Sequence, residues 1–292
     1  MKRESEAETV RAIEGNSLLR RLWRRSRRLV RKDRYTVVVL FLFLVTACFA
    51  QWLAPHDPVQ VDFSEKWKPV SRDHFFGTDQ YGRDVFSRVL YGGQIECMVV
   101  LIVLLGAAGI GVPLGVFSGY FKGRADYWIS RLTDALLGFP PLLLALAVVT
   151  IVGFSLEGVI VAMITRTIPV ITRIARAATL SVSGEAYFEA ARSIGCSNLR
   201  IMRATVLPNI MNPLLVQFSD LAGKTIFLEA ELGFLGVGAQ PPSPSWGAML
   251  GEARTFILSH PMYLLLPSLV VIVVILAFNS LGDTLQKREG RE

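Results

Sequence analysis

Residues 184–208, GEAYFEAARSIGCSNLRIMRATVLP, decide the fold. This is the only long stretch of the chain that is polar, helical in pattern and placed between apolar runs of membrane length. Apolar side chains recur at spacings of three and four in each half, as they do along one face of a helix. They are Tyr187, Ala190, Ala191 and Ile194 in the first half and Leu199, Met202 and Val206 in the second. The pattern predicts two short amphipathic helices.

The residues between and after these helices are suited to a hinge. Gly195 can take the left-handed conformation that ends the first helix, Ser197 can accept the free amide hydrogens that begin the second, and Pro208 cannot continue it. Charged residues occupy the other faces: Glu185, Glu189, Arg192, Arg200 and Arg203. The hairpin is therefore expected in water or against a polar partner rather than in lipid.

The spacing of this hairpin resembles a known motif. Glu189-Ala190-Ala191, three residues, Gly195, nine residues and then Thr205-Val206-Leu207-Pro208 is similar to the EAA loop of the membrane subunits of bacterial ABC importers, which docks into the ATP-hydrolysing subunit. The family usually has Ile where Thr205 stands, and the two side chains share a branched shape. The resemblance implies that the residues coupling this chain to an ATPase are Glu189, Ala190, Ala191, Gly195, Leu207 and Pro208. An amphipathic cytosolic hairpin without a partner is the alternative.

Composition places the chain in a bilayer. Of its 292 residues, 52% are hydrophobic and only 19% are charged, which leaves too much apolar surface for an ordinary soluble domain. The net charge of +7 comes from basic residues beside apolar runs, twelve of them within residues 1–35. An arginine run can also bind nucleic acid, but this one is not interleaved with aromatic residues. We therefore expect no nucleic-acid partner, and the positive-inside rule predicts a cytoplasmic N-terminus.

Apolar runs, two of which contain charged residues, then predict an all-α polytopic membrane protein with six transmembrane helices. A basic cytoplasmic segment, 1–35, is followed by a first span, 36–54, an extracytoplasmic loop, 55–95, a five-helix core, 96–282, that contains the cytoplasmic loop 184–208, and a cytoplasmic tail, 283–292. The predicted core spans are 97–121, 135–156, 158–173, 209–231 and 262–282. Runs of this order can cross a hydrocarbon layer of about 30 Å. Both termini are expected in the cytosol.

Local patterns add expectations about packing. Gly111, Gly115 and Gly119 fall on one helix face at four-residue spacing, which favours close helix contact in lipid over phosphate binding. Asp84 and Arg88 are four apart and can pair on a helix that leads back to the membrane. Pro140-Pro141 lies near the start of the third span, where proline is tolerated.

Two further groups of motifs resemble the C-type permeases of the dipeptide, oligopeptide and nickel branch. One group comprises Gly77-Thr78-Asp79, Gly82-Arg83-Asp84-Val85, Ser87-Arg88 and Tyr91-Gly92, and the other Gly233-Phe234-Leu235-Gly236, Ala239-Gln240-Pro241-Pro242 and Trp246-Gly247. For the first group, a scaffold role and contact with a delivery protein both remain open.

That resemblance implies a type I ABC importer permease in a bacterial inner membrane. It also implies a homologous second permease, two ABC ATPase subunits that bind ATP and magnesium, and an extracytoplasmic substrate-binding protein. This chain itself is then expected to bind no cofactor. Peptides are the first candidate cargo, with nickel, metal chelates or another small solute as the alternative.

Charged residues inside predicted spans are candidates for the translocation pathway. Arg166 and Asp220 are expected near mid-membrane, where a charge costs roughly 2.5 to 3.5 kcal/mol and is seldom kept without a partner or a use. Asp220 can pair with Lys224 one turn on or with Arg166 across helices. Alternatively, Arg166 receives the carboxylate and Asp220 the ammonium group of a passing zwitterionic peptide.

Other function classes find less support. Gly223-Lys224-Thr225 mimics the end of a phosphate-binding loop, but position 218 is Phe where that motif needs Gly. His56, His74 and His260 show no metal-ligand spacing and no nucleophile motif stands near them, so we predict neither a metal site nor catalytic residues. Cys48, Cys97 and Cys196 show no pairing pattern. A stand-alone carrier would be expected to show inverted repeats.

Overall fold

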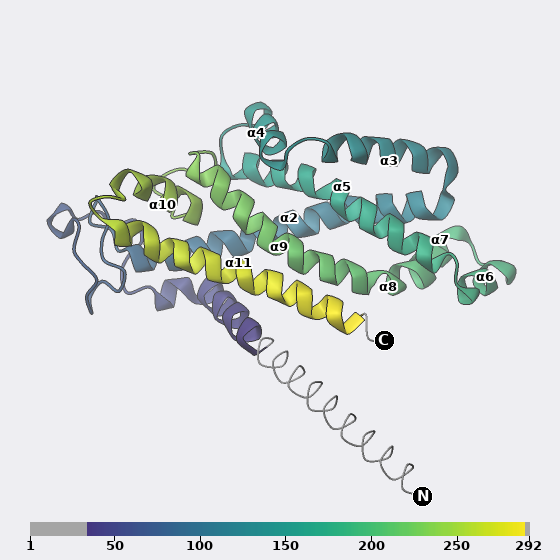
Figure 1. The fold of residues 1–292 in the computed structure, drawn as a ribbon, viewed down its shortest axis with the longest axis horizontal. Coiled ribbons are helices and arrows are strands. Elements are labelled where there is room, and N and C mark those ends of the chain that lie inside the picture. Colours follow the sequence, from purple (N-terminus) through teal and green to yellow (C-terminus); the bar gives the residue numbers. More distant parts are fainter. Residues whose placement is uncertain (1–33, 290–292) are drawn as a thin grey trace, which may run out of the picture.

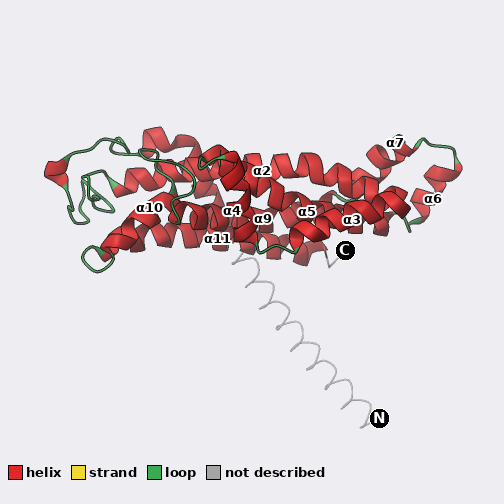
Figure 2. Ribbon diagram, turned by 90° about the horizontal axis from the view of Figure 1, so that it is seen from above, coloured by secondary structure: helices red, strands yellow, loops and turns green. Residues whose placement is uncertain are grey.

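The computed structural model describes residues 34–289, and helices make up most of them (Figures 1 and 2). Long helices run side by side along the longest axis of the molecule. Residues 54–84 and α10 lie at one end, which we call the polar-loop end, and the segment 184–210 lies at the other, which we call the hairpin end. The expectations for residues 1–33 fall outside the described residues.

The helices differ widely in length. The first described helix is Arg34–Leu53, and the long ones that follow are α2 (Val85–Phe121), α5 (Leu156–Val182), α9 (Met211–Phe234) and α11 (Pro261–Glu289). Shorter ones are α3 (Gly123–Leu137), α4 (Pro141–Val152), α6 (Ala186–Ser193), α7 (Asn198–Ile201), α8 (Leu207–Asn209) and α10 (Trp246–Ala253). Four described helices are long and apolar enough to cross a membrane, and α3 with α4 makes a fifth if this bent pair is one span. The multi-pass prediction is confirmed.

The predicted third span is not one helix. The chain bends by 96° between α3 and α4, at a break that contains Pro140 and comes directly before Pro141. Because Pro141 has no N–H and restricts the residue before it, it begins α4 instead of continuing α3. A proline near the start of a span was expected to be tolerated, and here it divides the span.

Two other boundaries also differ from the prediction. Helix α5 does not end at Arg173 but continues to Val182, since Arg173 and Arg176 pair with acidic residues of α3. The Arg176 guanidinium donates to Asp126 Oδ2 at 2.7 Å. Helix α9 occupies the place of the predicted fifth span, but Asp220, Lys224, Glu229 and Glu231 make it too polar to count among the four apolar spans.

The glycine stripe lies where α2 packs against α5. A Cβ atom added to Gly111 would come within 2.9 Å of the Ile168 carbonyl oxygen, and one added to Gly119 within 2.8 Å of the Arg176 carbonyl oxygen. Real Cβ atoms essentially never approach so closely. The prediction that these glycines serve helix packing is confirmed.

Several acidic and basic residues at the polar-loop end, among them Asp79 and Arg83, are buried and bonded within the chain. The Asp79 carboxylate accepts from Arg83 Nε at 2.6 Å, and Arg83 also donates to Glu252 of α10 at 2.8 Å. Burial disfavours the charged Arg83, but the carboxylates of Asp79 and Glu252 outweigh that effect and raise the pKa of its guanidinium. This favours the scaffold role for the Gly82-Arg83-Asp84 motif.

The predicted pair between Asp84 and Arg88 is wrong. Asp84 caps α2, which begins at Val85 and not near 97, and its Oδ2 accepts from the Ser87 amide at 2.7 Å. Arg88 donates instead to the Pro58 carbonyl oxygen at 2.9 Å. An aspartate in the cap position turns its carboxylate towards the free amides of the first turn, and therefore away from the residue four positions on.

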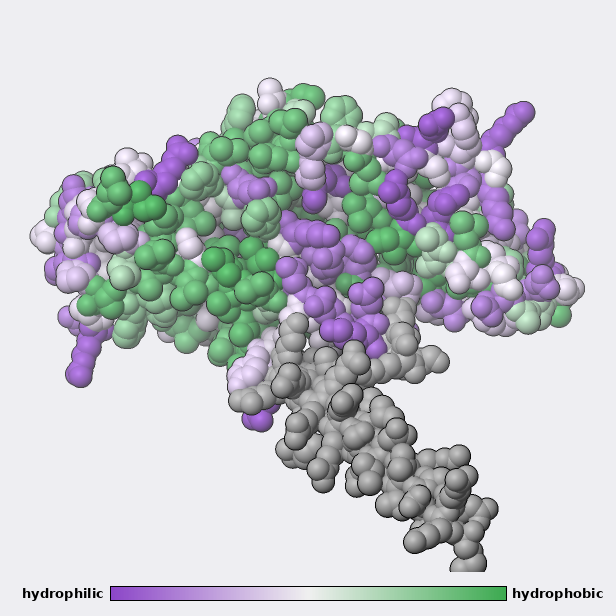
Figure 3. Space-filling model, viewed as in Figure 1, coloured by the Kyte–Doolittle hydropathy of each residue, from purple (hydrophilic) through white to green (hydrophobic). Residues whose placement is uncertain are grey.

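The hydropathy of the surface changes along the long axis of the molecule. Hydrophobic side chains cover much of the left and central part of the face in Figure 3, and hydrophilic side chains gather towards the hairpin end. Large apolar side chains are exposed on several long helices, among them Leu105 of α2, Leu269 of α11 and Phe41 of the first described helix. Such a surface fits lipid rather than water.

Candidate functional site

The hairpin projects from the end of the helix bundle (Figure 1). Its first half is α6, and its second half runs through α7, a π-helical turn at Met202–Val206 and α8. The predicted pair of short helices is therefore present, with the second half divided into three consecutive segments. Pro208 does not end the second half as expected, because it lies within α8, and the break before α9 comes at Ile210.

Gly195 turns the chain between the two halves. Its φ is +79°, the left-handed conformation that glycine adopts at little cost, so its predicted conformation is confirmed. A Cβ atom at this position would meet nothing within 4 Å. Gly195 is thus required by the backbone conformation and not by close packing. Ser197 takes the cap position of α7, but its side chain makes no capping hydrogen bond.

The apolar face that anchors the hairpin differs in part from the predicted one, because Val206 was predicted but Phe188 and Ile201 were not. Phe188, Ile201 and Val206 are buried in a cluster that includes Ile171 and Val182 of α5. The Phe188 ring also meets Tyr120 of α2 at a centroid distance of 5.9 Å. The sequence pattern omitted Phe188 because its stripe was drawn through the neighbouring Tyr187.

The predicted stripe faces mostly outwards instead. Ile194 is 80% exposed, Leu199 54% and Tyr187 46%. Glu189, Ala190, Leu207 and Pro208 are exposed as well, while Ala191 is half-buried. The six residues predicted to couple this chain to an ATPase thus lie on or beside a surface with large exposed apolar side chains.

The candidate pathway residues do not all meet. Lys224 donates to Asp220 Oδ2 at 2.7 Å along α9, and Gln217 donates to the same oxygen at 3.1 Å. The structure shows no salt bridge between Arg166 and Asp220. Arg166 is half-buried in α5, and it forms no salt bridge with any of the described carboxylates. The pairing of Asp220 with Lys224, one of the expected arrangements, is therefore present.

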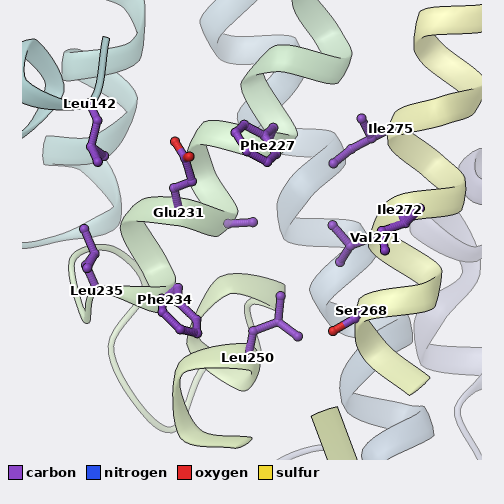
Figure 4. Close-up of a pocket in the computed structure, with 11 residues that line it drawn as sticks. Leu142, Phe227, Glu231, Phe234, Leu235, Leu250, Ser268, Val271, Ile272 and Ile275 are labelled. Atoms are coloured by element: carbon purple, nitrogen blue, oxygen red, sulfur yellow. The ribbon is translucent and has the colours of Figure 1, made fainter. Parts of the chain in front are cut away.

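Glu231 borders an apolar cavity that the sequence did not reveal (Figure 4). The cavity measures about 440 Å³ and lies between α4, α9, α10 and α11. Its other lining residues are almost all apolar, among them Leu142, Phe227, Phe234 and Ile272. In Figure 4 the Glu231 carboxylate lies between Leu142 and Phe227. A single carboxylate in such a setting can orient a cation or an amino group.

Two further carboxyl groups are enclosed inside the helix bundle. Glu96 of α2 and Glu229 of α9 are fully buried, and none of their four carboxyl oxygens has a hydrogen bond of good geometry. The sequence pattern places Glu229 inside the predicted fifth span, but it gives no sign that Glu96 lies next to Glu229. The meeting of two residues 133 positions apart becomes visible only when α2 and α9 are packed together.

Folding brings two of the three histidines together and leaves the third apart from them. His56 and His74 stack with ring centroids 4.7 Å apart, and His74 bonds to Asp84, whereas His260 stacks on Trp67. Their positions in the sequence show no metal-ligand spacing, but the fold brings two of them together beside a carboxylate.

Comparison with known proteins shows which family shares this sequence. Residues 111–291 match the family model described as binding-protein-dependent transport system inner membrane component. The dipeptide transport system permease protein DppC of Alkalihalophilus pseudofirmus is 37% identical over 267 residues, which cover 90% of this chain and 88% of that protein. The glutathione transport system permease protein GsiD of Escherichia coli is 42% identical over 266 residues, with 90% and 87% covered.

A solved structure shares the fold. A chain of the MetNI methionine ABC transporter in inward-facing conformations superposes with a TM-score of 0.57 at 18% identity, covering 67% of this chain and 93% of that one. The family model spans the hairpin, the glycine stripe and α9, and the relatives extend over nine tenths of the chain. This chain is therefore a permease subunit of the ABC importer class and belongs to the family of binding-protein-dependent transport system inner membrane components.

Proposed function

We propose that this chain forms half of the translocation pathway of an ATP-driven importer and that its hairpin docks into an ATP-hydrolysing subunit. The exposed apolar face of the hairpin carries this proposal. Ile194 is 80% exposed although the hairpin itself is anchored by the buried Phe188. A cluster of large apolar side chains on a polar element is typical of a protein interface.

The hairpin can transmit motion because it is joined to the bundle by packed contacts. Phe188, Ile201 and Val206 share one buried cluster with residues of α2 and α5, including Val116 and Ile171. A displacement of the hairpin by its partner is therefore passed to the two helices whose backbones are in closest contact. Nucleotide-driven closure of the ATPases would in this way alternate the pathway between outward- and inward-facing states.

The proposed complex contains a homologous second permease, two ABC ATPase subunits and an extracytoplasmic substrate-binding protein, in a bacterial inner membrane. The family description, which speaks of binding-protein-dependent transport, supports such an assembly. ATP and magnesium would be bound by the ATPase subunits, and this chain would hydrolyse nothing and hold no cofactor for that reaction. We expect no part for nucleic acid.

We further propose that the hairpin end and both termini face the cytosol. Lys122 and Arg124, at the turn between α2 and α3, lie at the same end as Arg192, Arg200 and Arg203 of the hairpin. An excess of basic residues marks the cytoplasmic side. The twelve basic residues among positions 1–35 support the same orientation.

Peptides are the cargo that the relatives favour. DppC is named for dipeptide transport and GsiD for transport of glutathione, which is a tripeptide. Arg166, Glu231 and the Asp220–Lys224 pair are charged groups on α5 and α9 that could meet the ends of a zwitterionic peptide. Nickel or metal chelates remain the alternative cargo within the same permease branch.

A crosslinking experiment tests the docking proposal. A cysteine at Ala190, in a chain whose native cysteines are replaced by serine, should crosslink to an ATPase subunit in assembled membranes. A cysteine at Ser64, which is exposed at the polar-loop end, serves as the control and should not. Glu189→Lys should abolish peptide uptake at normal abundance. Absence of the Ala190 crosslink, or normal uptake by Glu189→Lys, contradicts docking.

A further inference from the structure

We propose that His56, His74 and Asp84 form a binding site for a divalent transition metal ion, with Zn²⁺ as the best match. One ligand atom from each of these residues lies within 4.8 Å of the other two. Two imidazoles with one carboxylate are a donor set that suits zinc, and zinc held by three protein ligands takes water in its fourth position.

His74 is already oriented for this role. Its Nε2 lies 3.1 Å from Glu65 Oε2, and its Nδ1 lies 2.9 Å from Asp84 Oδ1. A histidine that binds a metal through one nitrogen usually gives the hydrogen on its other nitrogen to a carboxylate, which fixes the tautomer and the ring. With Glu65 in that position, Nδ1 is the nitrogen left to bind the ion.

The two carboxylate oxygens of Asp84 have different partners. Its Oδ2 accepts from the Ser87 amide and the Ser87 hydroxyl, both at 2.7 Å, and caps α2. Its Oδ1 is turned towards the two histidines, 2.9 Å from His74 Nδ1 and 3.9 Å from His56 Nδ1. The helix cap therefore holds one oxygen in place and presents the other to the site.

His56 can complete the site with a small movement. Metal–nitrogen bonds of about 2.0 to 2.1 Å place neighbouring ligand atoms roughly 3.0 to 3.4 Å apart. His56 Nδ1 lies 3.9 Å from Asp84 Oδ1 and must therefore approach that oxygen by less than about 1 Å. Its side chain is 40% exposed, while those of His74 and Asp84 are buried. A cavity of about 530 Å³ opens beside His56 and gives an ion and its water a path from the polar-loop end.

Such an ion would join three segments that are otherwise linked by hydrogen bonds and aromatic ring contacts. His56 belongs to the chain that leaves the first described helix, His74 to the loop, and Asp84 to the start of α2. In the orientation proposed above, this places the site outside the cytosol and away from the hairpin. The site would stabilise the polar-loop end and is independent of the cargo.

Equilibrium dialysis of the purified full-length chain against ZnCl₂ tests the proposal, with a purification tag that contains no histidine. The chain should retain one zinc ion, which should raise its unfolding temperature. His56→Ala should lose this ion, and Glu65→Gln should bind it about 10- to 100-fold more weakly. His260→Ala, which alters a histidine stacked on Trp67, is the matched control and should bind zinc like the unmodified chain.

Unfolding of His56→Ala without zinc shows whether this exposed substitution disturbs the fold. The proposal is overturned if the unmodified chain retains no zinc ion, or if His56→Ala retains it equally well. Equal loss from His260→Ala would show that the zinc was bound elsewhere and would also overturn it.

Discussion

Gly195 shows how one residue can decide the course of a functional segment. Its left-handed conformation reverses the chain between α6 and α7, and the space around it is open. The sequence predicted this conformation because a glycine followed the last apolar residue of a helical pattern. It did not predict that Phe188 would anchor the segment, since two adjacent aromatic residues offer two stripes and only the packing against α5 selects one.

Gly195→Val should lower peptide uptake by roughly 5- to 30-fold at normal abundance. A side chain in the left-handed conformation costs roughly 1–2 kcal/mol, and about 1.4 kcal/mol corresponds to a factor of ten. A Cβ atom at position 195 touches nothing in this chain. The cost therefore concerns the backbone conformation in which the hairpin docks, and not packing within the chain. Peptide uptake is measured in membrane vesicles, and abundance by immunodetection. Gly195→Asn, which tolerates the left-handed conformation, should keep most activity. Equal uptake by Gly195→Val and the unmodified chain contradicts the prediction.

Asp220 and Lys224 form an ion pair along α9, and we expect its two members to depend on each other. Asp220→Asn or Lys224→Gln alone leaves one unpaired charge, which should lower the amount of folded protein in the membrane. The double variant should restore it. Arg166→Gln is the comparison, because Arg166 does not share this pair. Abundance that stays unchanged in both single variants, with uptake altered by blocking the peptide termini, would show that the pair acts on cargo instead.

Among whole elements, α2 and α5 illustrate a prediction that local sequence supports well. Three glycines at four-residue spacing can serve only one helix face, and in the structure that face meets the α5 backbone. The bend between α3 and α4 was harder to foresee, because a proline pair is compatible both with the start of a span and with a break between two helices. The choice depends on the contacts of α3 with α5, which involve residues 39 and 50 positions apart.

Gly115→Ala should destabilise the contact between these helices. Gly115 is buried against the Thr172 carbonyl and the Ala175 side chain, and overpacking of such a contact costs about 1–3 kcal/mol. The purified protein should unfold at a lower temperature. Gly109→Ala is the matched control on the same helix, where an added Cβ atom meets nothing within 4 Å, so it should be neutral or slightly stabilising. The same loss of stability in both variants would show that close packing is not the cause.

For the molecule as a whole, the class of protein and the multi-pass helical fold could be predicted from the sequence. Apolar runs, basic flanks and the spacing around Gly195 are local signals that are present in the sequence itself. The meetings of Glu96 with Glu229 and of His56 with His74 could not be predicted, because they depend on the packing of segments far apart in the chain. On α9 the neighbouring helices shield Glu229 fully, whereas the side chains of Lys224 and Asp220 stay 54% and 37% exposed.

Orientation is the last property of the whole molecule that we predict. In a chain whose native cysteines are replaced by serine, a cysteine at Ser64 should react with an impermeant thiol reagent in intact cells. A cysteine at Ile194 should react only after the membrane is opened, and assembled ATPase subunits should then protect it. Both side chains are exposed, so a difference in labelling reports the side of the membrane and not burial. Labelling of Ile194→Cys from outside would reverse the orientation and would remove the hairpin from the compartment that holds ATP.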